Sequence, residues 1–272
     1  MSPRGRRMLL ALSIVLALYA LLCLAGCGLY RHALFPAPRD QGPEIPPGAT
    51  QLALYADDGN PVYAVHFPAP EGAPTVVHFH GNGETLRTLL PFGVELHRSG
   101  LGVLLVEYRG YGSSPGAPTE AGLYLDATAV LDALDRDGVP SARVVLSGTS
   151  LGTGVAAEMA ARGRGARLVL MTPYTSIPRL ARRFAPFLPT GWIIDDRFDT
   201  LSKAPRLHLP VLIIHGDADE VVPYAMGQEL AAAIPGARLI TVPGGHHNDL
   251  FALRGQALRA ALVAHALGQA VP

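Results

Sequence analysis

Cysteine is nearly absent from this sequence, which has two in 272 residues, at positions 23 and 27. Both lie in an N-terminal apolar run, so the rest of the chain cannot form an internal disulfide. Its stability must come from core packing, and a hydrophobic content of 49% is ample for this. The length is compatible with one large α/β domain or two small ones.

The sequence also lacks an excess of charge of either sign. It has 22 basic and 22 acidic residues, and it has no basic stripe interleaved with aromatic side chains. Binding to nucleic acid depends on such a stripe to neutralise phosphates. We therefore expect no nucleic-acid partner.

One long uncharged, mostly apolar run is present, from Met8 to Tyr30, and arginines at positions 4, 6 and 7 precede it. A basic segment followed by an apolar run is typical of an export signal. The run includes Leu24-Ala25-Gly26-Cys27, which resembles the lipobox of bacterial lipoproteins. That resemblance implies a signal peptide over residues 1–26 and a lipid on Cys27 that attaches the protein to a membrane.

Two further expectations follow from this segment. Residue 28 is Gly rather than Asp, which by resemblance to Gram-negative sorting rules implies the outer membrane in a host of that kind. The alternative to a lipoprotein is an uncleaved transmembrane anchor, since about 20 apolar residues can span a bilayer. Loss of residues 1–26 removes three arginines and no acid, which changes the net charge from 0 to −3.

The segment 27–49 is expected to be a tether, because its stretch from residue 29 to 48 is rich in proline and has no periodicity. The folded domain is expected over residues 50–272. It opens with "TQLALYA" and "PVYAVHF" on either side of "DDGN", which predicts an antiparallel hairpin.

After the hairpin, apolar strands alternate with longer amphipathic segments. The strands are "TVVHFH", "GVLLVEY", "RVVLSG", "RLVLM", "VLIIHG" and "RLITV". This alternation predicts an α/β fold with a doubly wound, mostly parallel sheet. The rhythm breaks between Pro173 and Pro210, so we expect a short cap at about residues 174–209.

In such sheets the ligand crevice lies beyond the carboxyl ends of the strands. His80, Ser150, Asp219 and His247 each follow a strand, so these four groups are expected at one edge. Ser150 also lies between Gly148 and Gly152 in "GTSLG", the G-x-S-x-G pattern of a tight strand-to-helix turn. Larger side chains at positions 148 and 152 would clash with that turn.

The chain order Ser150, Asp219, His247 is that of the nucleophile, acid and base of α/β-hydrolases. The segment "HFHGNGET" follows the first parallel strand, and its glycines let backbone N–H groups face the site. We expect an oxyanion hole formed by the Asn82 N–H, with Gly83 as a further donor, and by the Leu151 N–H.

Together these motifs resemble the α/β-hydrolase superfamily, in the branch of membrane-associated depalmitoylases and serine-aminopeptidase-like or dienelactone-hydrolase-like proteins. The matching pieces are "HGNGE", "EYRGYGSS", "GTSLGTG", "TPYTSI", "DRFDTL", "IIHGDADEVVP" and "GGHHND". The resemblance implies hydrolysis of a carboxylic ester or thioester, on a small-molecule or acylated substrate, with no cofactor and no metal. A serine peptidase or amidase of the same fold, or a noncatalytic ligand-binding lipoprotein, are the alternatives.

The sequence presents two choices between neighbouring residues: which histidine is the base and which of three acids orients it. His246 precedes His247, and the family motif favours His247 because it stands directly before Asn248. Asp217 and Glu220 flank Asp219; we expect Asp217 to shape its loop and Glu220 to lie near the next helix start.

Several further residues have structural interpretations. Tyr108, Arg109 and Tyr111 are expected to brace the loop after the second parallel strand. His78 and His80 lack a third metal ligand at a sensible spacing, so we interpret His78 as a core histidine and His80 as a residue that fixes its loop.

Overall fold

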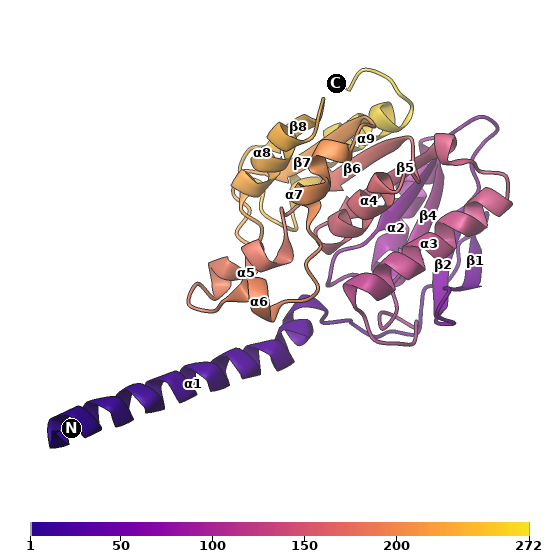
Figure 1. The fold of residues 1–272 in the computed structure, drawn as a ribbon. Helices are drawn as coiled ribbons and strands as arrows, with labels where there is room; N and C mark the ends of the chain where they lie inside the picture. Colours follow the sequence, from indigo (N-terminus) through magenta and orange to yellow (C-terminus); the bar gives the residue numbers. More distant parts are fainter. Residues whose placement is uncertain (1, 272) are drawn as a thin grey trace.

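The computed structural model describes residues 2–271 and shows a central sheet covered by helices on both faces, from which one long helix projects (Figure 1). The sheet has eight strands in the described residues, in the order β1-β2-β4-β3-β5-β6-β7-β8. β2 is antiparallel to β1 and β4, and the remaining neighbours are parallel. The strands are β1 Thr50–Tyr55, β2 Pro61–Phe67, β3 Thr75–Phe79, β4 Gly102–Glu107, β5 Val144–Thr149, β6 Arg167–Met171, β7 Val211–Gly216 and β8 Arg238–Val242.

This arrangement confirms the predicted doubly wound, mostly parallel sheet and its N-terminal hairpin. Successive side chains in a strand point to opposite faces, so an uninterrupted apolar run fills both cores. Val76 on β3 packs in one cluster and its neighbour Val77 in the other. A run such as "TVVHF" therefore becomes a strand buried on both faces.

Each face of the sheet carries its own helices. α2 (Leu86–Arg98) and α9 (Leu250–Ala266) contribute to one apolar cluster, which contains Val76. α3 (Glu120–Arg136), α4 (Leu151–Ala161) and α8 (Tyr224–Ala233) contribute to the other, which contains Val77. The loops at the carboxyl ends of the strands lie between these two layers and carry the candidate chemical groups.

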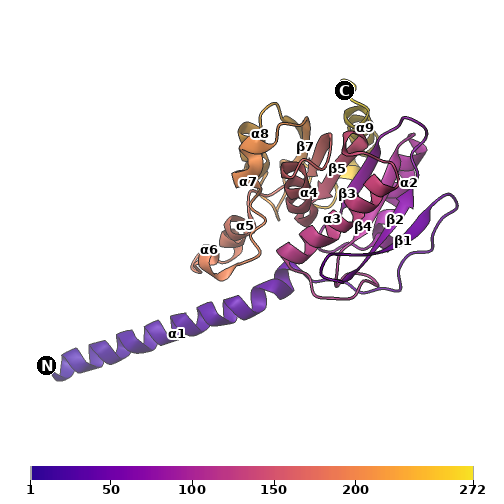
Figure 2. The ribbon, with the colours of Figure 1, turned by 45° about the vertical axis from the view of Figure 1, so that its right-hand side comes forward.

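The predicted cap lies between β6 and β7. It contains α5 (Ile177–Phe184), α6 (Thr190–Ile193) and α7 (Thr200–Lys203), followed by a 3₁₀ turn over Ala204–Arg206. α5 and α6 lie beside the projecting helix in both views (Figures 1 and 2). The cap therefore connects the sheet to the N-terminal segment.

The projecting helix α1 runs over Pro3–Leu34 without a break at Cys27. The extended tether that we expected from residue 27 thus begins only at Phe35. Pro36 disfavours helical backbone in the residue before it, which explains why the helix ends there. Its last turns are held by Tyr30 and Arg31, which both donate to the Asp196 carboxylate at 2.7 Å.

α1 is long and apolar enough to cross a membrane, with a mean hydropathy of 2.7 over its most apolar window. A signal sequence near an N-terminus has the same properties. The helix is therefore compatible with an export signal or with an anchor.

Candidate active site

The turn between β5 and α4 presents Ser150. Its backbone has φ of +47° and ψ of −113°, a strained conformation for a residue with a side chain. A Cβ at Gly148 would lie 2.3 Å from the Gly152 carbonyl oxygen, and one at Gly152 would lie 2.0 Å from the Phe79 oxygen. Both obstacles are backbone atoms, so the turn requires glycine on each side of the serine, as the sequence predicted.

Ser150, His247 and Asp219 form one hydrogen-bonded chain. His247 Nε2 lies 3.0 Å from Ser150 Oγ, and His247 Nδ1 lies 2.8 Å from Asp219 Oδ2. The Asp219 side chain is fully buried, whereas that of His247 is 9% exposed. Nδ1 must carry the proton to bond a carboxylate, so Nε2 can accept the proton of the serine hydroxyl.

The Asp219 carboxylate is held from several sides. Its Oδ1 accepts backbone N–H bonds from Val221 and Val222 at 2.9 and 2.8 Å. Burial alone would raise the pKa of Asp219, but the hydrogen bonds from His215 and His247 and the backbone N–H groups lower it well below its ordinary value. The group that orients the imidazole is therefore ionised at neutral pH.

His215, at the end of β7, is a supporting residue for which the sequence suggested no role. Its Nε2 lies 3.0 Å from the Val222 carbonyl oxygen and 3.3 Å from Asp219 Oδ2. Because a carbonyl only accepts, Nε2 carries the proton and is shared between the two oxygens. Gly227 lies against the other side of the ring, where a Cβ would come within 2.3 Å of Nδ1.

The structure gives the residues next to His247 and Asp219 contacts outside the hydrogen-bonded chain, which agrees with the choice of these two from the sequence. The His246 ring is at the surface, 57% exposed, and its Nδ1 lies 3.0 Å from Glu220. Glu220 therefore pairs with this histidine, and the expected position beside the next helix start is wrong, since α8 begins only at Tyr224. Asp217 accepts the Gly244 N–H at 2.7 Å, so it bonds a backbone N–H group as predicted, but the bond joins its loop to the loop after β8.

The expected oxyanion donors Asn82, Gly83 and Leu151 all line the same cavity as Ser150. Leu151 is the first residue of α4, and its N–H has no partner one turn earlier in the helix. The loop that carries Asn82 and Gly83 is held in place because Gly81 N–H donates to Glu84 Oε2 at 2.7 Å.

Glu84 is a second residue that the sequence did not single out. It lines the cavity with Ser150 and His247, and burial raises the pKa of its carboxyl group. The "GNGE" motif contains a signal for this position. The residue three places after Gly81 can close a turn by accepting the Gly81 N–H.

The cavity over Ser150 has a volume of about 760 Å³. Its walls are mostly apolar and come from four regions: α2, the β6 end, α5 and the start of α9. They include Leu89, Phe92, Met171, Leu180 and Phe251. Leu34, the last residue of α1, is also part of the lining. The site therefore combines a polar reacting edge with an apolar chamber.

His80 does not join the other three strand-end groups. Its Nδ1 lies 2.7 Å from the Gly81 carbonyl oxygen, and its ring packs on Tyr108 at a centroid separation of 4.1 Å. The expected convergence of four groups is thus reduced to three. The predicted role of His80 in fixing its loop is supported by these contacts. His78 lies 3.0 Å from Ser147 Oγ and is fully within the fold.

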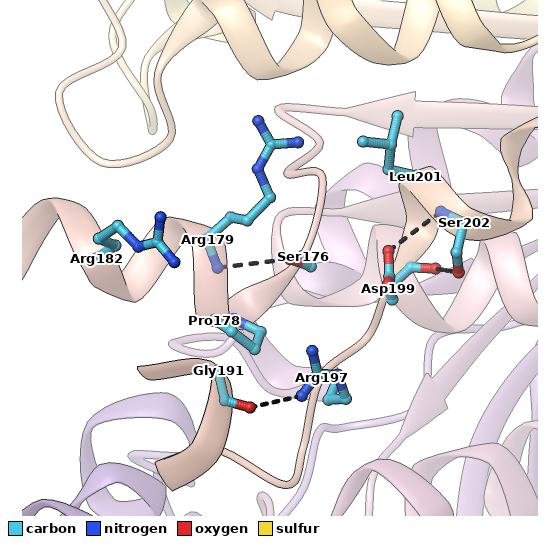
Figure 3. A pocket seen from close by; sticks show the side chains of 9 residues that line it. All are labelled: Ser176, Pro178, Arg179, Arg182, Gly191, Arg197, Asp199, Leu201 and Ser202. Carbon is cyan, nitrogen blue, oxygen red and sulfur yellow. Dashed lines mark hydrogen bonds between the residues drawn. The ribbon is translucent and has the colours of Figure 1, made fainter. Parts of the chain in front are cut away.

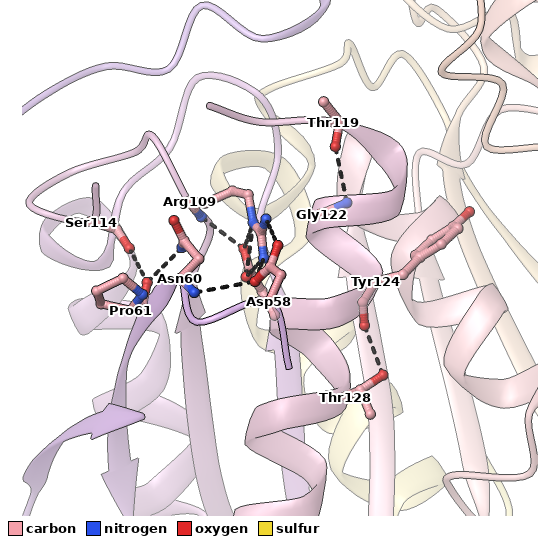
Figure 4. A network of polar contacts seen from close by, with 10 residues as sticks. Asp58, Asn60, Pro61, Arg109, Ser114, Thr119, Gly122, Tyr124 and Thr128 are labelled. Atoms are coloured by element: carbon pink, nitrogen blue, oxygen red, sulfur yellow. Dashed lines mark hydrogen bonds and ion pairs between the residues drawn. The ribbon is translucent and has the colours of Figure 1, made fainter. Parts of the chain in front are cut away.

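The loop after β4 is braced by Arg109 (Figure 4). This guanidinium bonds Asp126 on α3 at 2.7 and 3.0 Å and Asp58 in the hairpin turn at 2.6 Å. Tyr108 donates to the His80 carbonyl oxygen at 3.1 Å. The predicted bracing role of this loop is therefore present, and it links the hairpin, α3 and the loop that carries Asn82.

Known sequences show which family this arrangement belongs to. The family described as "Serine aminopeptidase, S33" matches residues 70–198, and that described as "TAP-like protein" matches residues 190–265. An uncharacterised protein of Mycobacterium tuberculosis is 34% identical over 234 residues, 84% of this chain and 83% of its own. The alpha/beta hydrolase domain-containing protein aho-3 of Caenorhabditis elegans is 36% identical over 187 residues, 67% of this chain and 55% of its own.

Solved structures show the same fold. An esterase of Pyrococcus furiosus superposes with a TM-score of 0.68 at 17% identity, over 85% of this chain and 99% of its own. A puromycin-hydrolyzing peptidase of Mycobacterium tuberculosis superposes with a TM-score of 0.67 at 23% identity, over 81% of this chain and 39% of its own. The chain belongs to the α/β-hydrolase family and is a hydrolytic enzyme.

Proposed function

We propose that this protein is a serine hydrolase that cleaves a carboxylic ester or thioester through an acyl-enzyme on Ser150. The observation that carries the proposal is the chain of contacts at 3.0 and 2.8 Å from Ser150 through His247 to Asp219. A strained turn with glycine on both sides presents the hydroxyl at its head.

In the first half-reaction, His247 Nε2 takes the Ser150 proton while Oγ bonds to the substrate carbonyl carbon. The carbonyl electrons move to oxygen, and the N–H groups of Leu151 and Asn82, with Gly83 beside them, stabilise that oxyanion. When the carbonyl re-forms, the bond to the leaving alcohol or thiol breaks, and this group takes the proton from His247.

In the second half-reaction, water replaces the leaving group. His247 removes one proton from water, the oxygen bonds to the acyl carbon, and Ser150 leaves with that proton. Asp219 stays ionised throughout and stabilises the imidazolium. The products are a carboxylic acid and an alcohol or thiol. Both half-reactions use residues of this chain and water.

The apolar lining of a cavity of about 760 Å³ supports an acyl group as the part of the substrate held there. A second candidate is peptide or amide hydrolysis, which is favoured by the match to the family described as "Serine aminopeptidase, S33". The same three groups can cleave an amide when His247 protonates the leaving amine. A noncatalytic binding role would not explain the strained backbone conformation of Ser150.

Fluorophosphonate labelling tests the nucleophile. Wild-type protein should label at Ser150, Ser150→Ala should keep its thermal midpoint and lose the label, and the matched control Ser202→Ala on the cap should label fully. Label retained by a folded Ser150→Ala would end the proposal. Ester and thioester series of increasing acyl length, with aminoacyl anilides alongside, then identify the bond cleaved.

We also propose that lipid on Cys27 attaches the protein to a membrane, on the basis of "LAGC" within the apolar run. Cys27→Ala should block acylation and cleavage and leave a larger precursor. Mass spectrometry of the wild type distinguishes the two interpretations. A diacylglyceryl group on an N-terminal Cys27 supports the lipoprotein, and an intact residue 1–27 segment without lipid supports an uncleaved anchor.

A further inference from the structure

An uncharged segment of the cap lies outside the catalytic cavity. It is "FAPFLPTGWII", residues 184–194, which has arginine before it at position 183 and aspartate after it at 195. Phe184, Phe187 and Trp192 are 63%, 64% and 91% exposed. None of these three aromatic side chains lines the cavity over Ser150. We call this segment the cap loop.

The exposure of the cap loop is concentrated rather than scattered. Of the large hydrophobic side chains exposed between residues 35 and 271, three of six are in this segment, and the others are Tyr55, Leu253 and Leu267. Single exposed apolar residues are ordinary, but a cluster of large aromatic ones marks an interaction site. Aromatic side chains are enriched where proteins meet the membrane–water interface.

The position of α1 identifies the partner. Tyr19, in the middle of this apolar helix, donates to the Phe187 carbonyl oxygen at 2.9 Å. Gly26 lies against the same segment, since a Cβ there would be 3.6 Å from Leu188 and from Ile193. Figures 1 and 2 show the cap helix α6 next to the C-terminal half of α1, with α5 behind α6.

The uncleaved anchor and the lipoprotein cleaved before Cys27 would both place the bilayer beside the cap loop. If α1 remains as an anchor, the apolar residues that span the bilayer lie beside the cap loop. If cleavage leaves lipid on Cys27, the remaining turns of α1 are still held to the cap, because Tyr30 and Arg31 both donate to Asp196 at 2.7 Å. The inference therefore does not depend on which form of attachment is correct.

Arginines surround the cap loop. Arg182 and Arg183 directly precede it and are exposed. Arg179, Arg182 and Arg197 line a shallow cavity of about 340 Å³ beside Gly191, together with the carboxylate of Asp199 (Figure 3). Arg179 pairs with Glu229 at 2.8 Å and Arg197 donates to the Gly191 carbonyl, whereas no ion pair of Arg182 is present in residues 2–271. Arginine at the rim of an apolar segment can bond lipid phosphate groups while the aromatic side chains insert.

We propose that the cap loop is a membrane-docking surface that inserts Phe184, Phe187 and Trp192 into the interfacial region of a phospholipid bilayer. The cavity over Ser150 includes Leu34 at the end of α1 and Leu180 on α5, so its walls adjoin both membrane-facing elements. Docking thus brings the cavity to the lipid surface. In combination with the proposed function, it assigns an acyl substrate that resides in the bilayer.

Trp192 is the only tryptophan in the chain, so its fluorescence reports on the cap loop alone. The full-length protein is reconstituted in phosphatidylcholine–phosphatidylglycerol vesicles, with and without lipids brominated at acyl positions near the headgroup. We expect Trp192 to be quenched by brominated lipid and protected from aqueous acrylamide. The matched control is Trp192→Phe/Tyr55→Trp, because Tyr55 is 73% exposed on β1, away from the cap. That reporter should respond to acrylamide only.

Two results would overturn the docking surface. In the first, acrylamide quenches Trp192 as strongly as it quenches the tryptophan at position 55, and brominated lipid does not quench it. Trp192 then faces water. Trp192 that is shielded from both quenchers is covered by protein, either another partner or a second copy of the chain. Ser150→Ala should keep the lipid quenching, so this measurement is independent of the catalytic proposal.

A second measurement tests whether docking increases turnover of substrates held in a membrane. Phe187→Ser should lower the rate on a long-chain ester held in vesicles by about tenfold, because one aromatic side chain no longer inserts. Hydrolysis of a short water-soluble ester should stay within about twofold, as expected for a residue outside the cavity. An equal loss on both substrates contradicts docking and points to a folding defect. No activity in the wild type contradicts the proposed function and leaves the quenching result as the test of the surface.

Discussion

The strand-end edge of the sheet and the cap differ in how their side chains are held. At the sheet edge, Asp219 has four hydrogen-bonding partners and a fully buried side chain, and Ser150 is fixed by a turn that only glycine neighbours permit. In the cap, Phe187 and Trp192 are mostly exposed. The proposed reacting groups thus lie on tightly held elements, and the side chains that we propose to meet the membrane lie on a lightly packed insertion.

This contrast predicts that a substitution at the sheet edge changes turnover by orders of magnitude, whereas one in the cap changes substrate preference modestly. The histidine pair gives the sharpest test. His247→Gln should lower turnover by ~10⁶, because the serine proton has no acceptor. His246→Gln should retain turnover within about twofold, since the exposed His246 ring pairs with exposed Glu220 rather than with Ser150 or Asp219. Turnover of both variants on one activated ester is the measurement, and a larger loss at position 246 would reverse the assignment.

The two aspartates near β7 give the next largest expected effect. Asp219→Asn keeps the size but favours the wrong imidazole tautomer, so turnover should fall by about 10⁴. Asp217→Asn weakens one loop hydrogen bond to Gly244, so it should cost about 1 kcal/mol of stability and little turnover. Turnover and thermal midpoint are compared for both. A severe loss of turnover in Asp217→Asn alone would show that Asp217, and not Asp219, orients the histidine.

A substitution of Glu107, at the end of β4, tests the sheet region by its effect on the free energy of unfolding rather than on turnover. Burial raises the pKa of its carboxyl group to about 7, and its Oε2 has no hydrogen-bond partner in residues 2–271. The folded chain therefore retains a proton that the unfolded chain releases at lower pH. The stability that this proton contributes is present in acid and is lost as pH rises through about 7.

Glu107→Gln copies the protonated form at every pH. We expect the variant to be more stable than wild type at pH 8 by up to about 3 kcal/mol and equally stable near pH 4. Urea unfolding at the two pH values measures this, with exposed Asp195→Asn on the cap as the control that should not change the difference. A variant that is destabilised at pH 8 would show that the carboxylate is needed in its ionised form.

The smallest effect is expected in the cap. Leu180 on α5 lines the cavity and is only partly buried. Leu180→Ala should raise KM for long acyl chains by about tenfold, because it removes apolar contact, and should leave kcat and the thermal midpoint nearly unchanged. Steady-state kinetics over an acyl-length series measure the effect. A fall in kcat for every chain length would place Leu180 among the residues that position the reacting groups.

Much of the fold could be predicted because its signals are local. Runs such as "VLIIHG" become strands buried on both faces, and "GTSLG" becomes a turn whose glycines are required by backbone atoms. The end of α1 was predicted less well. The proline-rich stretch indicated an extended tether from residue 27, but Tyr30 and Arg31 bond Asp196 in the cap and the helix continues to Leu34.

The sequence by itself determined the mostly parallel sheet, the position of the cap and the order of Ser150, Asp219 and His247, because periodicity, glycine spacing and chain order are all linear properties. Only the tertiary structure decided which of two adjacent histidines meets Ser150, that His215 and Glu84 support the site, and that the cap loop lies along α1. His215 and Glu84 contact residues only four and three positions away, Asp219 and Gly81. The other two outcomes depend on residues that are 26 to 168 positions apart, as in His246 with Glu220 and Tyr19 with Phe187. Such pairings are set by how the layers pack, which no local pattern encodes.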